Sequence, residues 1–348
     1  MLYFMSCAVR FIKVAKELSY GFPPPHPFRK DRLNLTLKTL DSVGALSKLD
    51  LIEVTQSASE EDILSFHSNE YLEFVKRMSK IGSGYLDQGD TPAFLGCYEV
   101  AATAVACTLK AIEEPKEDVH VINFNGGLHH AMPRRASGFC IFNDIAIAIK
   151  KLLERGFQKI AYVDIDAHHG DGVMYGFYGD KRVLDIDFHE DGRYLFPGTG
   201  FYYELGEGEA KGYKANIVLP PGASDKEYLY AYERVTKPLL EQFKPEILIL
   251  QAGVDAHEGD PLTHLKLTDQ GYLQLYKRIH NISHELRCPL VVLGGGGYDP
   301  NNVSRCWSAL TLTLLGENEF YKESKIEKIK IEDVELLTER LKEAGWKI

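Results

Sequence analysis

Two pairs of adjacent histidines are the first residues in this chain that suggest chemistry. His129 and His130 follow the glycines of NGGL, and His168 and His169 lie within DIDAHHGDG. Imidazole binds divalent metals in its neutral form and exchanges protons near neutral pH. Because aspartates and glycines accompany these pairs, the pattern predicts a site where some histidines bind a metal and others move protons.

The segment YVDIDAHHGDG supplies the candidate metal ligands. Asp164, Asp166 and His168 are each two residues apart, so they face the same way on an extended strand, and a carboxylate and an imidazole there can bind one ion. Asp255, in QAGVDAHEGDP, ends another expected strand and is the candidate third ligand. Two aspartates and one histidine leave coordination positions open, as in catalytic zinc sites. Taken alone, Asp-x-His is as compatible with a strand-end cap beside a structural histidine.

Beside a metal, the pair at His129 and His130 gains a role. A neutral imidazole can take the proton of metal-activated water as it attacks a carbonyl, and a second, charged imidazole can aid the transition state. Asp164 and Asp171 are the spare carboxylates near the metal segment, so we expect them to orient the two rings. An isolated histidine pair is more often packed in a turn, but Gly126 and the nearby aspartates favour catalysis here.

The segment GGGGY places four glycines before Tyr298. It lacks the Lys-Ser/Thr ending of a phosphate-binding loop. Glycines allow unusual dihedrals and close approach, so they can set Tyr298 against the site, where a phenol can donate a hydrogen bond to a developing oxyanion. The alternative is a flexible strand-to-helix turn with a packing tyrosine.

The elements that must position these residues alternate between short β-branched runs and segments of helical periodicity. The expected strands are 119–124, 159–166, 182–188, 214–219, 246–250 and 289–293, and the expected helices are 98–113, 141–155, 225–243 and 268–286. This alternation predicts an α/β fold, with a single open, doubly wound, mostly parallel sheet flanked by helices. Ligands bind beyond the carboxyl ends of such strands, and the polar clusters follow those ends.

We expect one domain over residues 1–348, with a charged helical tail at 320–348, because no linker or composition break divides the chain. The net charge of −10 argues against a nucleic-acid partner. No apolar run approaches the roughly 20 residues of a membrane span. Six scattered cysteines fit buried thiols in a reducing compartment. A cytoplasmic protein without a direct nucleic-acid or membrane partner is therefore expected.

Together these blocks resemble the zinc-dependent histone deacetylase family, in its class I-like branch of bacterial and archaeal acetoin-utilisation deacetylases. The likeness runs from HPFRKDRL to CWSALT through GGLHHA, ASGFCIFND, YVDIDAHHGDGV, FPGTG, GVDAHEGDPL and GGGGYDPNNVSRCW, whereas residues 1–15 match poorly. The resemblance implies an arginase/deacetylase-like fold. It also implies a hydrolase that removes acetyl groups from ε-N-acetyl-lysine of proteins by metal-activated water.

The resemblance implies a role for each matching residue of the centre. The metal, Zn²⁺ with Fe²⁺ as the alternative, would be bound by Asp166, His168 and Asp255. The matching catalytic residues are His129, His130, Asp164, Asp171 and Tyr298. Among them His130 would be the general base, His129 its electrostatic partner, and Tyr298 the group that polarises the acetyl carbonyl.

The resemblance also implies a substrate channel and a structural K⁺ or Na⁺ ion. The matching substrate-binding residues are Asp90, at the rim, and Gly138, Phe139, Phe196 and Leu262, along a narrow apolar channel. The matching monovalent-cation residues are Asp164, Asp166, His168, Asp187 and Phe188. Here Asp187-Phe188-His189 replaces the usual Ser-Leu-His of the family. We expect the added carboxylate of Asp187 to alter the monovalent site.

Three alternatives stay open beside a protein-lysine deacetylase. An acetylpolyamine or other small-molecule amide deacetylase would share the chemistry, although NGGLHHAM and Leu262 favour the protein-directed side. An arginase-like ureohydrolase would need ligands for two manganese ions in another pattern. A non-catalytic acyl-lysine-binding scaffold would be expected to lose Tyr298, a metal ligand or one histidine, and all are present. The acetylated partner, a histone-like protein or an acyl-CoA ligase, is not determined by the sequence.

Overall fold

One parallel sheet organises the chain. The computed structural model describes residues 8–113, 115, 118–317 and 329–348. Within them, eight strands pair side by side in the order β2-β1-β3-β8-β7-β4-β5-β6, and every pair is parallel. The strands are β1 (Ala8–Val14), β2 (Asp50–Val54), β3 (Val119–Asn123), β4 (Ile160–Asp164), β5 (Val183–Glu190), β6 (Lys214–Leu219), β7 (Ile247–Gln251) and β8 (Leu290–Leu293). The predicted α/β class is confirmed, and the sheet is wholly rather than mostly parallel.

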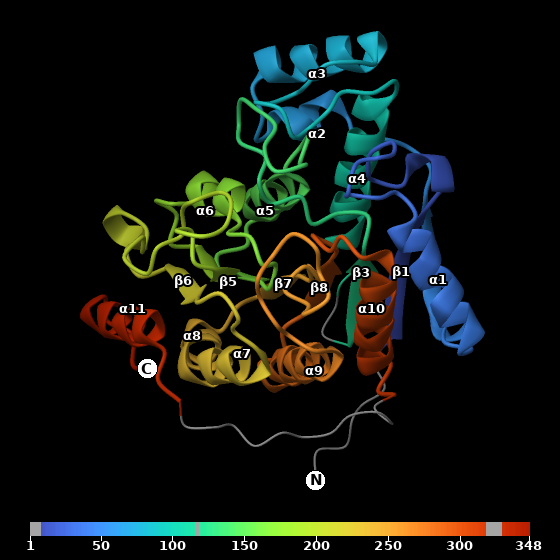
Figure 1. Cartoon of the computed structure of the whole chain (residues 1–348). Coiled ribbons are helices and arrows are strands. Elements are labelled where there is room, and N and C mark those ends of the chain that lie inside the picture. Colours follow the sequence, from blue (N-terminus) through green and yellow to red (C-terminus); the bar gives the residue numbers. More distant parts are fainter. Residues whose placement is uncertain (1–7, 114, 116–117, 318–328) are drawn as a thin grey trace.

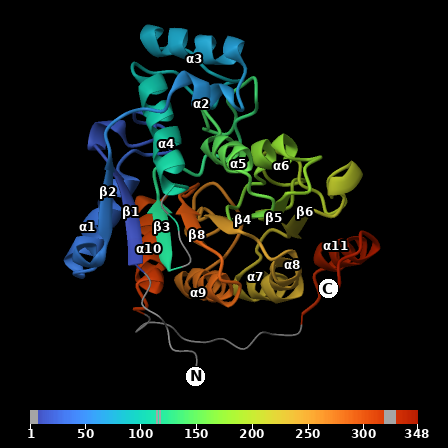
Figure 2. The same cartoon turned by 180° about the vertical axis from the view of Figure 1, so that it is seen from behind.

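Helices cover both faces of the sheet, which explains why strands such as IAYVD are buried along their whole length. In Figures 1 and 2, α7, α8 and α9 lie in a row on one side of the strands, and α5 and α6 lie on the other. The helices are α1 (Arg32–Ser42), α2 (Glu60–Leu64), α3 (Asn69–Ile81), α4 (Cys97–Ala111), α5 (Asp144–Glu154), α6 (Asp171–Gly176), α7 (Asp225–Ala231), α8 (Lys237–Phe243), α9 (Asp269–Glu285), α10 (Pro300–Leu314) and α11 (Glu332–Glu343).

The strand order brings distant motifs together. The four central neighbours are β3, β8, β7 and β4, and each is followed by one of the polar motifs. Their last residues lie in register across the sheet: Asn123 pairs with Leu293, Leu293 with Gln251, and Gln251 with Asp164. The chain leaves β3 and returns as β4 on the far side of β7 and β8, which makes this edge the topological switch point where α/β sheets bind ligands.

Helix boundaries follow the predicted signals, with one irregularity. Ser224 and Glu227 form the reciprocal capping box at the start of α7. The expected helix 225–243 is interrupted by a π-helical turn, Tyr232–Thr236, between α7 and α8. The expected helix 268–286 is α9, which starts at the Thr268 cap, where the side chain accepts from the amide of Gly271.

The part of the fold before residue 98 was not predicted. β1 falls within residues 1–15, which matched the family poorly, yet it pairs with both β2 and β3. Its burial alternates irregularly, with Phe11 and Ile12 both buried, and β2 is mostly exposed at the sheet edge. Short strands without a clean period of two cannot be told from other structure by pattern alone.

The helical tail expected at 320–348 lies only partly within the described residues and stays a prediction. Within 320–348, α11 packs on β6 and buries Val334, Leu337 and Leu341, while residues 320–328 lie outside the described residues. The described cysteines, 97, 107, 140, 288 and 306, are free and buried. Among the described residues, the helices are all too short or too polar to span a membrane.

Candidate active site

The three predicted metal ligands converge. The Nδ1 atom of His168 lies 2.9 Å from Oδ2 of Asp255 and 3.2 Å from Oδ1 of Asp166. All three side chains are buried, although they come from the segments after β4 and β7. Burial and the charge of Asp166 raise the pKa of Asp255 to about 8. A buried surplus of negative charge beside a nitrogen donor fits a divalent cation.

Two glycines form the wall behind these carboxylates. A Cβ atom on Gly296 would lie 2.1 Å from Oδ2 of Asp255, and one on Gly253 would lie 2.3 Å from Oδ2 of Asp166. Neither glycine has a left-handed backbone, so space rather than dihedral angle requires glycine here. The backbone after β7 and β8 therefore packs directly against the ligand oxygens.

The Asp166 carboxylate is the most heavily hydrogen-bonded ligand. Its Oδ2 accepts from the amide of Gly296 at 2.7 Å and from Nε2 of Gln251 at 2.8 Å. Burial opposes ionisation, but the charges of His129 and His168 outweigh it and hold the pKa of Asp166 well below its usual range. Gln251 was not recognised from the sequence, although it stands in the quoted block QAGVDAH at the end of β7.

Each histidine of the first pair donates to its own carboxylate. Nδ1 of His129 donates to Oδ2 of Asp164 at 2.7 Å, and Nδ1 of His130 donates to Oδ1 of Asp171 at 2.8 Å. The structure thus brings together both expected pairs. The rings lie against each other, with centroids 3.9 Å apart, and Tyr162 adds its hydroxyl to Asp164. Each Nδ1 carries the donated proton, and Nε2 of His129 lies 3.9 Å from Oδ1 of Asp166.

The two rings differ in charge. Burial lowers the pKa of a histidine, but Asp164 and Asp166 outweigh it at His129 and raise its pKa to about 10. At His130, burial and the neighbouring charge of His129 lower the pKa to about 4, against the pull of Asp171. At neutral pH the site therefore holds one imidazolium and one neutral imidazole side by side.

The start of α5 positions this histidine pair. The buried carboxylate of Asp144 accepts from the amides of Gly127 at 3.0 Å and Leu128 at 2.8 Å. The side-chain amide of Asn143 donates to the carbonyls of His129 and Ala131. Neither residue was assigned a role from the sequence, and their only signal was the block ASGFCIFND.

Tyr298 is positioned by a buried arginine. Nη1 of Arg32, on α1, donates to the carbonyls of Gly295 and Gly297 at 2.9 and 3.0 Å. The Tyr298 ring lies 6.4 Å from that of His168, and burial together with Asp255 raises the pKa of the phenol well above 10, so it stays protonated. Sequence reasoning missed Arg32, because nothing local links HPFRKDRL to the glycine segment.

The two predicted channel phenylalanines flank the centre. The Phe196 ring lies 5.1 Å from that of His130, and the Phe139 ring lies 5.7 Å from that of Tyr298. Between them, a Cβ on Gly138 would lie 2.4 Å from Cδ2 of His130 and 2.8 Å from Cε1 of Phe196. Gly138 therefore keeps this space open.

Phe139 has a strained backbone, with φ of 66°. Its carbonyl accepts from the Tyr20 hydroxyl at 2.7 Å, and its amide donates to the Thr91 hydroxyl at 3.1 Å. These two hydrogen bonds hold the ring of Phe139 in place beside Tyr298.

A cavity of about 580 Å³ opens next to the centre. Its lining joins the predicted residues Asp90, Gly138 and Phe196 to Asp171. Phe139 and Leu262 are not in this lining. Leu262 is exposed on a loop, and its backbone amide donates to the carboxylate of Asp260. The channel position of Leu262 therefore stays a prediction.

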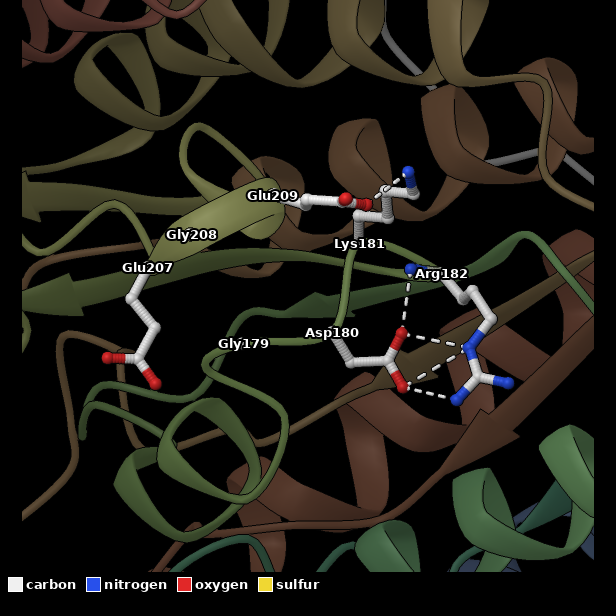
Figure 3. Close-up of a pocket in the computed structure, with 7 residues that line it drawn as sticks. All are labelled: Gly179, Asp180, Lys181, Arg182, Glu207, Gly208 and Glu209. Carbon is white, nitrogen blue, oxygen red and sulfur yellow. Dashed lines mark hydrogen bonds and ion pairs between the residues drawn. The ribbon is translucent and has the colours of Figure 1, made fainter.

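Another hollow, of about 690 Å³, lies before the amino end of β5 (Figure 3). Four of its charged groups form two ion pairs, since Lys181 lies 2.6 Å from Glu209 and Arg182 lies 2.6 Å from Asp180, and Glu207 also lines the hollow. It shares no residue with the metal ligands, so we do not associate it with the chemistry.

The added carboxylate of Asp187 is occupied by hydrogen bonds. It accepts from the amide of Gly170 at 2.7 Å and from Nδ1 of His189 at 2.7 Å. Nε2 of His189 faces the carbonyl of Gly200 at 2.7 Å, so both ring nitrogens donate, in keeping with a raised pKa of His189. The added carboxylate of Asp187 is thus matched by hydrogen bonds from Gly170 and His189. The predicted monovalent site at 164, 166, 168, 187 and 188 stays a prediction.

Comparisons with known proteins agree with this geometry. A model of the histone deacetylase domain matches residues 26–314. The acetoin utilization protein AcuC of Bacillus subtilis is 38% identical over 318 residues, covering 88% of this chain and 82% of that protein. The probable histone deacetylase 1-A of Xenopus laevis is 36% identical over 313 residues, covering 85% and 62%. A deacetylase homologue from Aquifex aeolicus superposes with a TM-score of 0.79 at 31% identity, covering 95% and 88%; a deacetylase homologue has also been solved complexed with SAHA.

The close packing of Gly296 against the predicted metal ligands can be tested by substitution. Gly296→Ala should weaken divalent-metal binding by roughly tenfold to a hundredfold, because overpacking costs about 1–3 kcal/mol and the added methyl meets Oδ2 of Asp255. The measurement is zinc affinity by competition with a chromophoric chelator.

The matched control is Gly179→Ala, on the surface, where a Cβ would have only an ordinary contact with Glu207 at 3.4 Å. Unchanged zinc affinity in Gly296→Ala would mean that the backbone after β8 does not pack against a metal-binding carboxylate.

Proposed function

The chain belongs to the histone deacetylase family, and from this we propose that it is a zinc-dependent deacetylase acting on ε-N-acetyl-lysine of proteins or peptides. Membership of this family makes the chain a deacetylase, which is a hydrolase. The family implies a metal cofactor and an acetylated substrate. The finer proposal is supported by one observation: the rings of His129 and His130 lie side by side, each hydrogen-bonded to its own carboxylate, next to the three predicted metal ligands.

The two histidines divide the proton chemistry. His130 is neutral, and its Nδ1 proton is held by Asp171, so its Nε2 lone pair can take the proton of the attacking water. His129 is already charged, so it cannot act as a base; its imidazolium stabilises negative charge that develops beside it. The protonated His130 can then give its proton to the departing lysine amine.

Asp166, His168 and Asp255 would hold the metal, which when bound supplies a Lewis acid that activates water and polarises the acetyl carbonyl. We favour zinc over iron(II), although this ligand set serves either. Tyr298, kept protonated by its surroundings and positioned by Arg32, would donate to the carbonyl oxygen as charge develops on it.

The surroundings favour a slim side chain that ends in a neutral amide. Phe196 and Phe139 provide apolar rings on the two sides of the centre, and Gly138 leaves the space between His130 and Phe196 open. At the outer end of the cavity, the exposed carboxyl of Asp90 would accept a hydrogen bond from the substrate backbone. A peptide offers this backbone, whereas an acetylated polyamine does not.

The proposal is tested by comparing two substrates with tag-free protein. We expect acetate release from an acetyl-lysine peptide, little release from an acetylated polyamine, loss of activity with a chelator, and recovery with zinc. Asp255→Asn serves as the control that lacks a metal ligand. The opposite substrate preference would assign the chain to small-molecule deacetylation, and stoichiometric metal binding without turnover of either substrate would favour an acyl-lysine-binding scaffold.

Tyr298→Phe should slow turnover by roughly 10²–10³-fold while metal affinity stays unchanged, because only the donor to the developing oxyanion is lost. The measurement is kcat with the acetyl-lysine peptide, together with zinc affinity. Wild-type kcat in this variant would remove Tyr298 from the mechanism.

The pH dependence of KM should report Asp90. Burial and the adjacent carboxyl of Asp87 raise the pKa of Asp90 to about 7. Below that pH the group is neutral, and above it the carboxylate accepts a stronger hydrogen bond. KM for the peptide should therefore fall as pH rises from 6 to 8, roughly threefold to tenfold, since the group is exposed and the gain is screened.

Asp90→Asn accepts equally at every pH, so its KM should lose this step while kcat keeps its pH profile. The same KM step in the variant and the wild type would exclude Asp90 as the titrating group.

A further inference from the structure

Three histidines meet far from the candidate active site. His120 is the second residue of β3, and His280 and His284 are one turn apart on α9. Their Nε2 atoms form a closed triangle: 3.1 Å from His120 to His284, 3.1 Å from His120 to His280, and 2.9 Å from His280 to His284. This cluster, His120–His280–His284, was not noticed in the sequence.

Hydrogen bonds alone cannot satisfy this triangle. An N–H···N bond needs one protonated and one bare nitrogen, and an imidazole Nε2 is one or the other. With three atoms in mutual contact, at least two have the same state. That pair then directs two lone pairs, or two protons, at each other across about 3 Å. A cation bound by all three lone pairs removes the conflict.

The spacing suits a small metal ion. Bonds of about 2.0–2.1 Å to nitrogen place two ligand atoms roughly 2.9–3.0 Å apart at right angles and roughly 3.3–3.4 Å apart in a tetrahedron. The observed 2.9–3.1 Å lies at the lower end of this interval. A water molecule, which needs about 2.8 Å to each partner, would leave the nitrogen pairs in conflict.

The cluster contributes three imidazole nitrogens, and the carboxyl of Asp118 acts electrostatically on His284. His120 and His280 are buried, and His284 is half-buried, so solvent can reach one side of the cluster. Burial, followed by the mutual repulsion of the rings, also lowers the pKa of His120 and of His280, which keeps their lone pairs available. Among the described residues, Nδ1 of His120 has no hydrogen-bond partner, and this ring's polar contacts there are made through Nε2.

We propose that His120, His280 and His284 bind a second divalent transition metal, zinc in particular, with solvent as the remaining ligand. The site ties α9 to the amino half of β3; the two elements are about 160 residues apart in the chain. α9 (orange in Figure 1) lies beneath the strands there. The register of β3 with β8, β7 and β4 sets His120 at the end of the sheet away from Asp166. Its role is therefore structural and independent of the proposed deacetylation.

A third group of potential ligands does not share these properties. His257, Asp269 and Cys306 also lie close together. However, Asp269 is exposed and already paired with Arg305 at 3.2 Å, so its charge is compensated without a metal. We make no proposal for that group.

The test measures metal content and stability of tag-free protein. After loading with zinc and gel filtration, the wild type should retain two equivalents per chain, and His280→Gln and His284→Gln should retain one. His264→Gln is the matched control, because this exposed histidine lies outside both sites, and it should retain two. Asp255→Asn, which damages the family's metal centre, should also retain one, now at the histidine cluster.

Combining Asp255→Asn with His284→Gln should leave no tightly bound zinc. Zinc should raise the melting temperature of Asp255→Asn but not that of the double variant, since a ligand that binds only the native state stabilises it. His284 is half-buried, so His284→Gln should fold, and its melting curve without metal checks this. The same zinc content in His284→Gln as in the wild type, or no retained zinc in Asp255→Asn, would overturn the second site. Loss of deacetylation in any variant would not bear on it.

Discussion

Buried negative charge at the carboxyl edge of the sheet is the constraint on which the site depends. Asp164, Asp166 and Asp255 are all fully buried, and an isolated carboxylate in such surroundings is strongly unfavourable. The protein offsets this with backbone amides, with the side chains of Gln251 and His168, and with an imidazolium at His129. The remaining surplus, seen in the raised pKa of Asp255, suits the proposed divalent metal.

The same buried charge gives the adjacent histidines His129 and His130 different pKa values. His129 faces Asp164 and Asp166 and is charged, whereas His130 faces a charged neighbour and is neutral. One group is thereby suited to stabilise charge and the other to accept a proton, without any difference in the side chains themselves. Pairs of titratable groups with divergent pKa values mark acid–base sites, and here the divergence follows from where each ring points.

The histidine cluster on β3 and α9 is electrostatically the reverse of the candidate active site. It has three neutral nitrogens, whereas the active centre combines one nitrogen with two carboxylates. A metal bound by three neutral nitrogens would keep its full charge, whereas two carboxylates would partly neutralise a metal at the candidate active centre. The two sites would therefore divide structural and chemical roles between opposite ends of one sheet.

The sequence by itself determined the class of the fold, and it predicted which residue types would lie at the centre. Asp166 and His168 are close together in the sequence, and the glycine-rich segments indicate close packing. The alternation of strands and helices implies a parallel sheet. Strand β1 was missed, because AVRFIKV has no clean period, and Arg32, Asp144 and Gln251 were missed because their partners are distant in the chain.

Only the tertiary structure decided which strand ends meet and which histidines form a cluster. The order β3-β8-β7-β4 places Gln251 beside Asp164, and the packing of α9 on β3 joins His120 to His280. Local periodicity predicts whether a residue is buried and on which face of its own helix or strand it lies. It does not predict which other strand or helix packs against that face, because this depends on how the crossover connections arrange the strands.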